Sequence, residues 1–341
     1  MLDEKKNNRI VASIEQFYKF NGIKSENYTS NHVEAYVENK KYDPQIARSE
    51  LEKKIGYWIE RFDEQDREYF YSLFENYNYI SADEYKYRIW QLSEAIYADV
   101  EEKQIKREEV LFVTVASSEG VGSGGDCLRA NLLSMNMEWG MDKNLIIADI
   151  EKMSPKLLDD KKVIVFIDDI LGTGFSVKRT IESFVEHCGE KSLQDCLVYV
   201  TGILMTKRAV KYINKKIKKV RVFQLEKETN SIKSCMTGGY IFKGEEIHKI
   251  EKIVEKYEKE IGIEGEKNFV MGFERCKILL SFYYNTPNNT ICSFWKCAGK
   301  NIPPFPRDKD RRPTLDAIRK RKKKNTDNAY QKGCLKDYEN V

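Results

Sequence analysis

The sequence predicts an α/β protein with a mainly parallel sheet, an N-terminal helical region and a C-terminal cap. Up to about residue 105, apolar residues recur at three- and four-residue steps, which is typical of amphipathic helices. From about residue 108, short apolar runs alternate with amphipathic stretches, which is typical of parallel strands joined by helices. We therefore predict a helical region over residues 1–105, an α/β domain with its cap over 106–306, and a basic tail over 307–341.

The composition is that of a globular protein and indicates no particular partner. The chain has 341 residues, of which 41% are hydrophobic, and its net charge is only +4. Its eight cysteines form no CxxC pair and it has three histidines, so a zinc site is not expected. No apolar run approaches the roughly 20 residues that span a bilayer, and scattered cysteines suit a reducing compartment. We expect a cytoplasmic protein that makes no membrane contact.

Three apolar stripes in the N-terminal region predict helices that bury one face. The stripes consist of Ile10, Ile14 and Phe17; of Leu51, Ile55, Trp58, Ile59 and Phe62; and of Tyr85, Ile89, Leu92 and Ile96. Ser81 and Glu84 form a candidate capping box before the third stripe. Stripes of this kind are mostly core, and a surface that docks a partner is the alternative.

The α/β region contains a series of candidate strands with helices between them. The strands are predicted at residues 110–116, 145–149, 163–168, 197–204 and 220–225. Downstream, residues 245–263 predict a long helix, and a further strand begins at residue 278 and ends in an Asn/Pro-rich turn. Open parallel sheets bind ligands outside the carboxyl ends of their strands, so we expect a site in the loops that follow strands.

The loop after the first candidate strand, SSEGVGSGGD, is rich in glycine. It contains G-x-G-x-x-G at Gly120, Gly122 and Gly125, and Asp149 ends the next candidate strand, where a dinucleotide fold places a ribose-binding acid. The loop lacks the Lys-Ser/Thr ending of a P-loop, which disfavours triphosphate hydrolysis of that type. A dinucleotide site and a tight strand-to-helix turn are both open interpretations.

The loop DDILGTGFS follows an apolar strand and predicts a phosphate site. Backbone N–H groups at the start of the next helix can converge on an anion, helped by the helix dipole. These are the N–H groups of Thr173, Gly174, Phe175 and Ser176. The hydroxyls of Thr173 and Ser176 add donors, and glycine at Gly172 and Gly174 lets the backbone approach the anion.

Two adjacent carboxylates, Asp168 and Asp169, precede this turn and require a separate explanation, because carboxylates repel phosphate. Acceptor-only groups suit the 2′ and 3′ hydroxyls of a ribose, directly or through a hydrated Mg²⁺. Acids at one end of the turn and amides at the other match the length of a ribose 5-phosphate. The alternative is an acidic strand end followed by a helix N-cap.

The segment VIVFIDDILGTGFSV resembles the phosphoribosyl-pyrophosphate motif of type I phosphoribosyltransferases. The resemblance implies a sheet of that kind, Mg²⁺ as cofactor, and Asp168 and Asp169 as the ribose-side acids that carry catalysis and hold the metal. The Gly-Thr-Gly turn then matches the 5′-phosphate turn. The first glycine loop takes the place of the pyrophosphate loop, with Ser118, Glu119, Gly120, Gly122, Ser123, Gly124 and Gly125.

A narrower resemblance covers more of the chain. The segments IGYWIERFDEQDREYFYSLFENYNYIS and SFYYNTPNNTICSFWKCAGKNIPPFPR, with both glycine loops, resemble the PRTase-CE domains of bacterial conflict systems, from roughly residue 49 to Arg307. Members of that family are inferred to be effectors of antiviral defence, sometimes encoded beside retron reverse transcriptases. The resemblance implies a defence role, with a protein or a reverse transcriptase and its RNA as partner.

The predicted function is a phosphoribosyltransferase-like reaction at ribose C1′ of a phosphoribosyl or nucleotide substrate, by glycosyl transfer or by cleavage of an N-glycosidic bond. Many purine-salvage enzymes of this superfamily carry an acidic base three residues after the second aspartate, where this chain has Gly172. Purine salvage is therefore disfavoured. Two alternatives are open: a nucleotide or ribosyl-phosphate sensor without turnover, and a nucleic-acid-binding component of a defence complex.

The C-terminal third offers further candidate residues. Asn285, Asn288 and Asn289 in NTPNNT either hydrogen-bond a ligand over the site or form a turn. Trp295 is expected in the core rather than as a stacking platform. Arg307 is expected to be exposed, and a phosphate contact is the alternative.

The basic run in the tail has two interpretations. It is a solvated flexible segment, or it binds nucleic acid through release of counterions. The residues concerned are Arg319, Lys320, Arg321, Lys322, Lys323 and Lys324.

Overall fold

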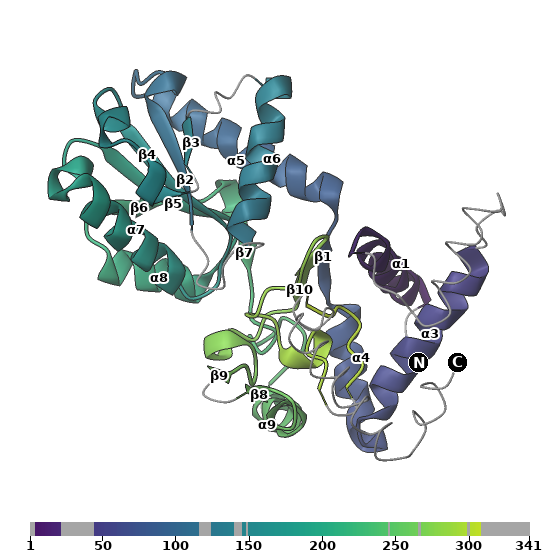
Figure 1. Ribbon diagram of the computed structural model, residues 1–341. Helices are drawn as coiled ribbons and strands as arrows, with labels where there is room; N and C mark the ends of the chain where they lie inside the picture. The colour runs from purple at the N-terminus through teal and green to yellow at the C-terminus, as the bar shows by residue number, and fades with distance from the viewer. Residues whose placement is uncertain are drawn as a thin grey trace, which may run out of the picture.

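The computed structural model describes residues 4–21, 44–115, 124–139, 145–147, 149–244, 246–264, 267–298 and 301–307. The chain forms an α/β body and a second, mainly helical body that lie side by side (Figure 1). In the parts of the chain so described, no helix is long and apolar enough to cross a membrane.

The α/β body is built on a parallel sheet. Its strands are β2 (Val110–Thr114), β3 (Ile146–Ile147), β4 (Val163–Leu171), β5 (Leu197–Thr206), β6 (Val220–Val222) and β7 (Ser231–Ile232). Their order is β3-β2-β4-β5-β6, with β7 also pairing with β5, and every pairing is parallel. The mainly parallel α/β sheet predicted from the sequence is thereby confirmed.

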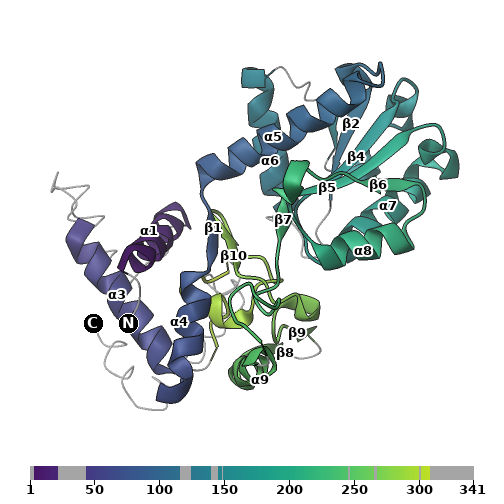
Figure 2. The same ribbon diagram turned by 180° about the vertical axis from the view of Figure 1, so that it is seen from behind.

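Helices cover both faces of this sheet (Figures 1 and 2). The helices are α5 (Ala82–Glu101) and α6 (Gly124–Trp139) on one face, and α7 (Phe175–Cys188) and α8 (Lys207–Lys216) on the other. Each face has its own apolar core: Ile89 and Leu128 pack on the α5 side, and Val177 and Ile213 pack on the α7 side. Central strands buried on both faces explain the continuous apolar run that precedes Asp168.

The helical body combines the two ends of the described chain. It contains α1 (Glu4–Asn21), α3 (Pro44–Glu60), α4 (Arg67–Glu75) and α9 (Glu246–Lys259), with short pairs of strands formed by β1 (Asn78–Ile80) and β10 (Leu280–Phe282) and by β8 (Ile263–Glu264) and β9 (Lys267–Asn268). One apolar cluster joins the N-terminal helices to residues 235–305. The fully buried Trp58 of α3 contacts the C-terminal part directly: its indole N–H donates to the Ser293 carbonyl at 2.9 Å.

Short 3-10 helices connect the larger elements. They are Glu64–Asp66, Arg107–Glu109, Ile150–Lys152, Pro155–Leu158, Glu190–Leu193, Glu226–Glu228, Phe273–Arg275 and Cys292–Phe294.

Most of the expected elements form, and all three apolar stripes are buried, which confirms their interpretation as core. The Ser81 hydroxyl accepts from the Glu84 N–H at 3.2 Å and caps α5 as predicted. All five strands of the predicted sheet end two or three residues from the predicted position. Strand β4 extends to Leu171 because its pairing with β5 continues, whereas β6 stops at Val222. The domain boundaries at residues 105 and 306 remain predictions.

A buried carboxylate holds the helical body together. Glu258 at the end of α9 is fully buried and accepts hydrogen bonds from the backbone N–H groups of Met271, Cys292 and Ser293, at 3.2, 2.8 and 2.6 Å. Hydrogen bonds to a charged acceptor are among the strongest in proteins, and a buried donor left without its partner is costly. Glu258 therefore fixes two C-terminal loops to α9.

We predict that Glu258→Gln lowers the free energy of unfolding by about 2–4 kcal/mol. In the wild type the backbone N–H donors share the Glu258 carboxylate. In the variant, the N–H₂ group of the amide faces some of these donors and cannot accept from them. Urea unfolding measures the loss, and Glu260→Gln on the same turn, with a largely exposed side chain, should cost less than about 0.5 kcal/mol. Equal losses in the two variants would contradict this account of Glu258.

Candidate functional site

The sheet contains a reversal of strand order at β2 and β4. After β2 the chain moves outward to β3, and after β4 it moves to β5 on the opposite side. Doubly wound sheets bind ligands at such a point, outside the carboxyl ends of the strands. The segments that follow these two strands are the two glycine loops selected from the sequence.

The structure describes the second of these loops and only the end of the first. Of the predicted pyrophosphate loop, Gly124 and Gly125 form the beginning of α6. The remaining predicted residues, Ser118, Glu119, Gly120, Gly122 and Ser123, lie outside the described residues, as does the basic run Arg319, Lys320, Arg321, Lys322, Lys323 and Lys324. The predictions for these residues therefore stay predictions.

Strand β4 carries Asp168 and Asp169 within its length rather than beyond its end. Asp168 pairs with Gly202 of β5, and pairing resumes at Ile170 with Leu204. Ile167 and Ile170 both pack on the α5 face, although residues three apart in a regular strand point to opposite faces. The alternation of side chains between the two faces of β4 is therefore broken at the two aspartates. Their side chains point in directions that they would not have in a regular strand.

Asp169 is buried and fully engaged by protein donors. One carboxylate oxygen accepts from the Ile170 N–H at 2.7 Å, and the other accepts from the Tyr284 hydroxyl. Tyr284 follows β10, so the C-terminal segment contributes a residue to this site. Sequence reasoning missed Tyr284, because nothing in the run SFYYN distinguishes it from its neighbours.

Asp168 is half-buried and lies in a different electrostatic environment. Its Oδ1 accepts from the Asp169 N–H at 2.9 Å. Burial, and then the negative charge of Asp169, raise the pKa of Asp168 well above its usual value. The adjacent acids therefore differ: Asp169 is fixed by hydrogen bonds, whereas Asp168 retains its proton more readily and has a second oxygen that is not used in the bond to the Asp169 N–H.

A group of tyrosines surrounds the acid pair. The ring of Tyr85 on α5 lies 5.4 Å from that of Tyr283 and 5.7 Å from that of Tyr284. The Tyr283 hydroxyl accepts from the Asn131 amide of α6 at 3.0 Å. Burial, followed by the charge of Asp169, raises the pKa of both Tyr85 and Tyr284. These hydroxyls therefore remain protonated, and that of Tyr284 donates to Asp169.

The glycine turn connects β4 to α7 as the sequence predicts. Gly174 has φ +83° and is the residue that precedes the helix, a left-handed conformation that favours glycine. Thr173 is buried and its hydroxyl accepts from the Phe175 N–H at 3.3 Å, whereas Ser176 is half-buried in the first turn. The first N–H groups of a helix have no partner inside it, so this turn offers donors to an anion.

Residues at the start of α8 contact the glycine turn. The Thr206 hydroxyl donates to the Gly172 carbonyl at 2.6 Å and also accepts from the Ala209 N–H as the cap of α8. A Cβ placed on Gly174 would lie 2.9 Å from the Tyr212 ring. Helices α7 and α8 therefore fix the backbone of the turn together.

Of the three predicted cap residues, the structure brings Asn289 to this turn. A Cβ placed on Gly172 would lie 2.4 Å from the Asn289 Nδ2 atom, and Asn289 also donates to the Cys276 sulfur at 3.3 Å. The backbones of Asn285 and Asn288 make turn hydrogen bonds with Phe282 and Phe273. Asn289 thus fills the space beside Gly172.

Two further C-terminal residues selected from the sequence, Trp295 and Arg307, are buried. Trp295 is fully buried and donates to the Thr290 carbonyl at 2.8 Å, which confirms its place in the core. Arg307 was expected to be exposed, but only 7% of it is accessible and its guanidinium lies 5.2 Å from the Trp295 ring centre. A cation–π contact and a hydrogen bond from the Arg307 N–H to the Trp295 carbonyl explain the difference.

Asp149, the acid of the dinucleotide interpretation, lies at the surface after β3. Its carboxylate pairs with Lys152 at 2.7 Å, and that hydrogen bond lowers the pKa of Asp149. The Asp149 side chain thus pairs with a neighbour in the chain, and the dinucleotide interpretation stays untested.

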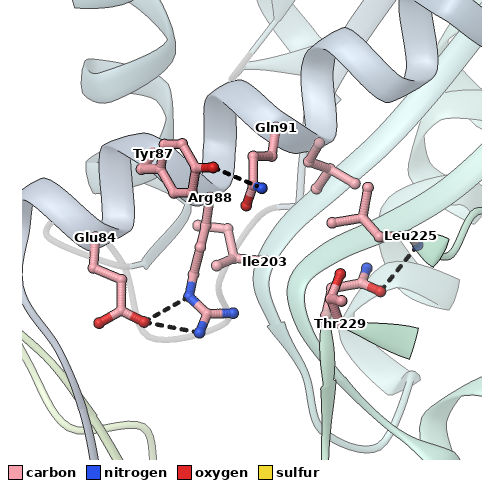
Figure 3. A pocket seen from close by; sticks show the side chains of 9 residues that line it. Glu84, Tyr87, Arg88, Gln91, Ile203, Leu225 and Thr229 are labelled. Carbon is pink, nitrogen blue, oxygen red and sulfur yellow. Dashed lines mark hydrogen bonds and ion pairs between the residues drawn. The ribbon is translucent and has the colours of Figure 1, made fainter. Parts of the chain in front are cut away.

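A cavity of about 380 Å³ lies between α5 and β5 (Figure 3). It is lined by Glu84, Tyr87, Arg88, Gln91, Leu92, Ile203, Leu225, Thr229 and Asn230. Arg88 donates twice to Glu84, at 2.9 and 2.8 Å. Asn230 donates to the carbonyl of Gly202 at 3.1 Å, so the cavity wall contacts β5 at the residue that pairs with Asp168 of β4.

The donor set fits a magnesium ion shared with a ligand. The described residues contain no group of three or more His, Cys, Asp or Glu side chains that could enclose a metal. Mg²⁺ needs only one or two carboxylates when ligand oxygens and water complete its shell. Asp168, whose pKa is raised by burial and by Asp169, is the carboxylate that a cation would stabilise in its charged form.

Comparison with known proteins identifies the family. The PRTase-CE profile matches residues 55–307. The chain belongs to the PRTase-CE family. The recognition made from the sequence is confirmed, and the PRTase-CE region includes the acid pair, the glycine turn and Asn289. Neither the curated proteins nor the solved structures contain a match to the chain.

We predict that Gly172→Ala lowers the free energy of unfolding by about 1–3 kcal/mol, because the new methyl group overlaps the Asn289 amide. In an Asn289→Ala background the same change should cost at least about 1 kcal/mol less. Urea unfolding of the four proteins in this cycle measures the coupling. Gly56→Ala in α3, where a Cβ meets nothing within 4 Å, should instead stabilise the protein. Additive effects at 172 and 289 would contradict the contact.

We predict that the free energy of unfolding of Asp168→Asn, relative to that of the wild type, increases as pH rises. The folded-state pKa of Asp168 lies above its unfolded value of about 3.9, so the folded state holds the proton more tightly and its stability falls as pH rises between the two values. Asparagine does not titrate. Asp149→Asn should show the opposite sign, because the Lys152 hydrogen bond lowers the pKa of Asp149. Urea unfolding from about pH 2 to 8 measures both differences, because the effect of Asp149 lies below about pH 3.9 and that of Asp168 lies above it.

Proposed function

We propose that this PRTase-CE protein is an enzyme that acts at the ribose C1′ of a phosphoribosyl or nucleotide substrate in the cytoplasm. The observation that carries the proposal is one continuous segment at the reversal of strand order, in which an acid pair on β4 leads directly into a glycine turn that begins α7. Family membership supports a phosphoribosyltransferase-like domain.

The glycine turn supplies the contacts for the 5′-phosphate. The Phe175 N–H already donates to Thr173, so the next N–H groups of the first turn of α7 and the half-buried Ser176 hydroxyl donate to the phosphate oxygens, and the helix dipole favours the negative charge. Gly174 keeps its left-handed conformation without a side chain that would strike Tyr212. The turn is thus held in one conformation before the ligand arrives, which reduces the cost of binding.

The acid pair orients the sugar. Asp169 is fixed by Ile170 and Tyr284, so its negative charge has one position relative to the turn. Asp168 accepts from the ribose hydroxyls and would hold Mg²⁺, which when bound supplies positive charge to the leaving group. Fixed charges of this kind stabilise a transition state without reorganisation during the reaction.

In the proposed reaction the bond from C1′ to the leaving group breaks, and the leaving group keeps the electron pair. A nucleophilic atom of the acceptor, or water, forms the new bond to C1′ and releases its proton to solvent or to the leaving group. Positive charge develops on the sugar and is stabilised by the nearby carboxylate of Asp169. The Asn289 amide occupies the space beside Gly172. An acidic side chain at position 172, which could act as a general base, is therefore excluded sterically as well as absent from the sequence. This geometry favours an acceptor other than a purine base.

We also infer that the enzyme is an effector of bacterial antiviral defence, with a protein or a reverse transcriptase and its RNA as partner. The support is the family resemblance. In cells, the wild type should protect against phage or be toxic, and Asp168→Asn with Asp169→Asn should abolish that effect while the protein still accumulates.

A ligand sensor without turnover is the second candidate function. Two observations favour it: both oxygens of Asp169 are already used by protein donors, and the raised pKa of Asp168 favours its neutral form. A sensor would bind a ribosyl phosphate in the same place and release no product. Measuring binding and product in the same samples separates the two candidates.

We predict that phosphoribosyl pyrophosphate with Mg²⁺ raises the melting temperature of the protein, with about 2.7 kcal/mol of stabilisation at 100 times the dissociation constant. Asp168→Asn with Asp169→Asn should remove the part of this effect that depends on Mg²⁺. Mass spectrometry should detect released pyrophosphate or ribose phosphate with the wild type only.

Asp159→Asn with Asp160→Asn is the matched control, because it changes an adjacent, exposed aspartate pair by the same charge. It should leave binding and turnover unchanged. Binding without product would favour the sensor, and absence of any stabilisation would contradict both functions.

A further inference from the structure

The outer face of α8 is strongly basic. Residues 207–221 contain eight lysines and arginines and no acidic residue, in a chain whose net charge is +4. All of the cations are exposed: Lys207, Arg208, Lys211, Lys215, Lys216, Lys218, Lys219 and Arg221. This basic α8 surface, defined by these eight residues, lies on the outside of the α/β body next to α7 (Figures 1 and 2).

The charges are ordered by the helix. Ala209 and Ile213 are buried against the sheet, which leaves the opposite side to solvent. Lys207, Lys211 and Lys215 follow one another at four-residue steps, so they form a ridge with about 6 Å between successive Cβ atoms. The surface is therefore a regular line of cations rather than a scattered set.

Few anions in the protein offset this charge. Within the described part of the chain, the ion pair made by this segment is that of Arg208 with Glu274, at 3.5 Å. Neighbouring like charges destabilise a helix, and the lysine ridge has this cost in the isolated protein. A polyanion bound along the ridge would remove it.

We propose that the basic α8 surface binds the phosphodiester backbone of a nucleic acid. The ten-residue helix is about 15 Å long and presents charges at regular steps, as a backbone of repeated phosphates requires. A membrane is disfavoured, because an amphipathic helix binds lipid by inserting its apolar face, and here Ala209 and Ile213 are buried in the protein. The inference does not depend on the C-terminal tail or on catalysis.

Helix α8 begins beside the glycine turn of the candidate site. Thr206, which caps α8, donates to the Gly172 carbonyl of the glycine turn, and the ridge begins at the next residue. The first lysine of the ridge therefore lies next to the residue that contacts the glycine turn.

The experiment measures binding of fluorescent 20-nucleotide single-stranded RNA, and of the corresponding duplex, to the full-length protein at several salt concentrations. Lys207→Gln, Lys211→Gln and Lys215→Gln combined should weaken binding about tenfold and reduce the slope of log affinity against log salt by about 2 for the single strand. The corresponding lysine-to-arginine triple should retain binding. The two probes show whether single strand or duplex is the preferred form.

Lys243→Gln, Lys249→Gln and Lys252→Gln combined form the matched control, since they remove three exposed charges elsewhere. This variant and Asp168→Asn with Asp169→Asn should bind RNA as the wild type does, even if the protein has no enzymatic activity. The proposal is overturned if the α8 triple binds normally, if the control triple loses as much, or if the wild type binds vesicles of phosphatidylserine and phosphatidylcholine but neither nucleic acid.

Discussion

The pairing of β4 with β5 is the interaction on which the candidate site depends. It continues beyond the apolar part of β4 and carries Asp168 and Leu171 into register with Gly202 and Met205. The break in side-chain alternation at the aspartates exists only because both strands continue past it. Without that pairing, the two acids and the glycine turn would belong to a loop, and their relative positions would not be fixed.

The C-terminal segment contributes side chains to the candidate site on the sheet. Tyr284 donates to Asp169, and Asn289 lies against Gly172, so two residues from one segment contact both halves of the site. This segment is itself anchored by buried Glu258 and by the packing of Arg307 on Trp295. The catalytic geometry proposed for the sheet therefore depends on the folding of the helical body, although the acids and the turn belong to the α/β body.

Local pattern explains what the sequence predicts correctly. Apolar periodicity identifies the helices and the strands of the parallel sheet, and the run from Val163 to Ser176 places two acids and a phosphate turn in one segment. Contacts across the chain carry no such pattern. Nothing near Tyr284 signals its bond to Asp169, and the burial of Arg307 depends on a tryptophan ring that only tertiary packing brings beneath it. The end of β4 was misplaced because strand length is set by the partner strand, not by hydrophobicity alone.

The parallel pairing of β1 with β10 joins residues about 200 positions apart, from Asn78 with Leu280 to Ile80 with Phe282. During translation at about 5–20 residues per second, the N-terminal helices wait roughly 10–40 seconds before their packing partners emerge. A contact order this high slows folding and leaves Trp58 and Phe70 exposed meanwhile. The helical body therefore assembles after the parallel sheet, and premature release or truncation would leave those aromatic side chains as a substrate for chaperones.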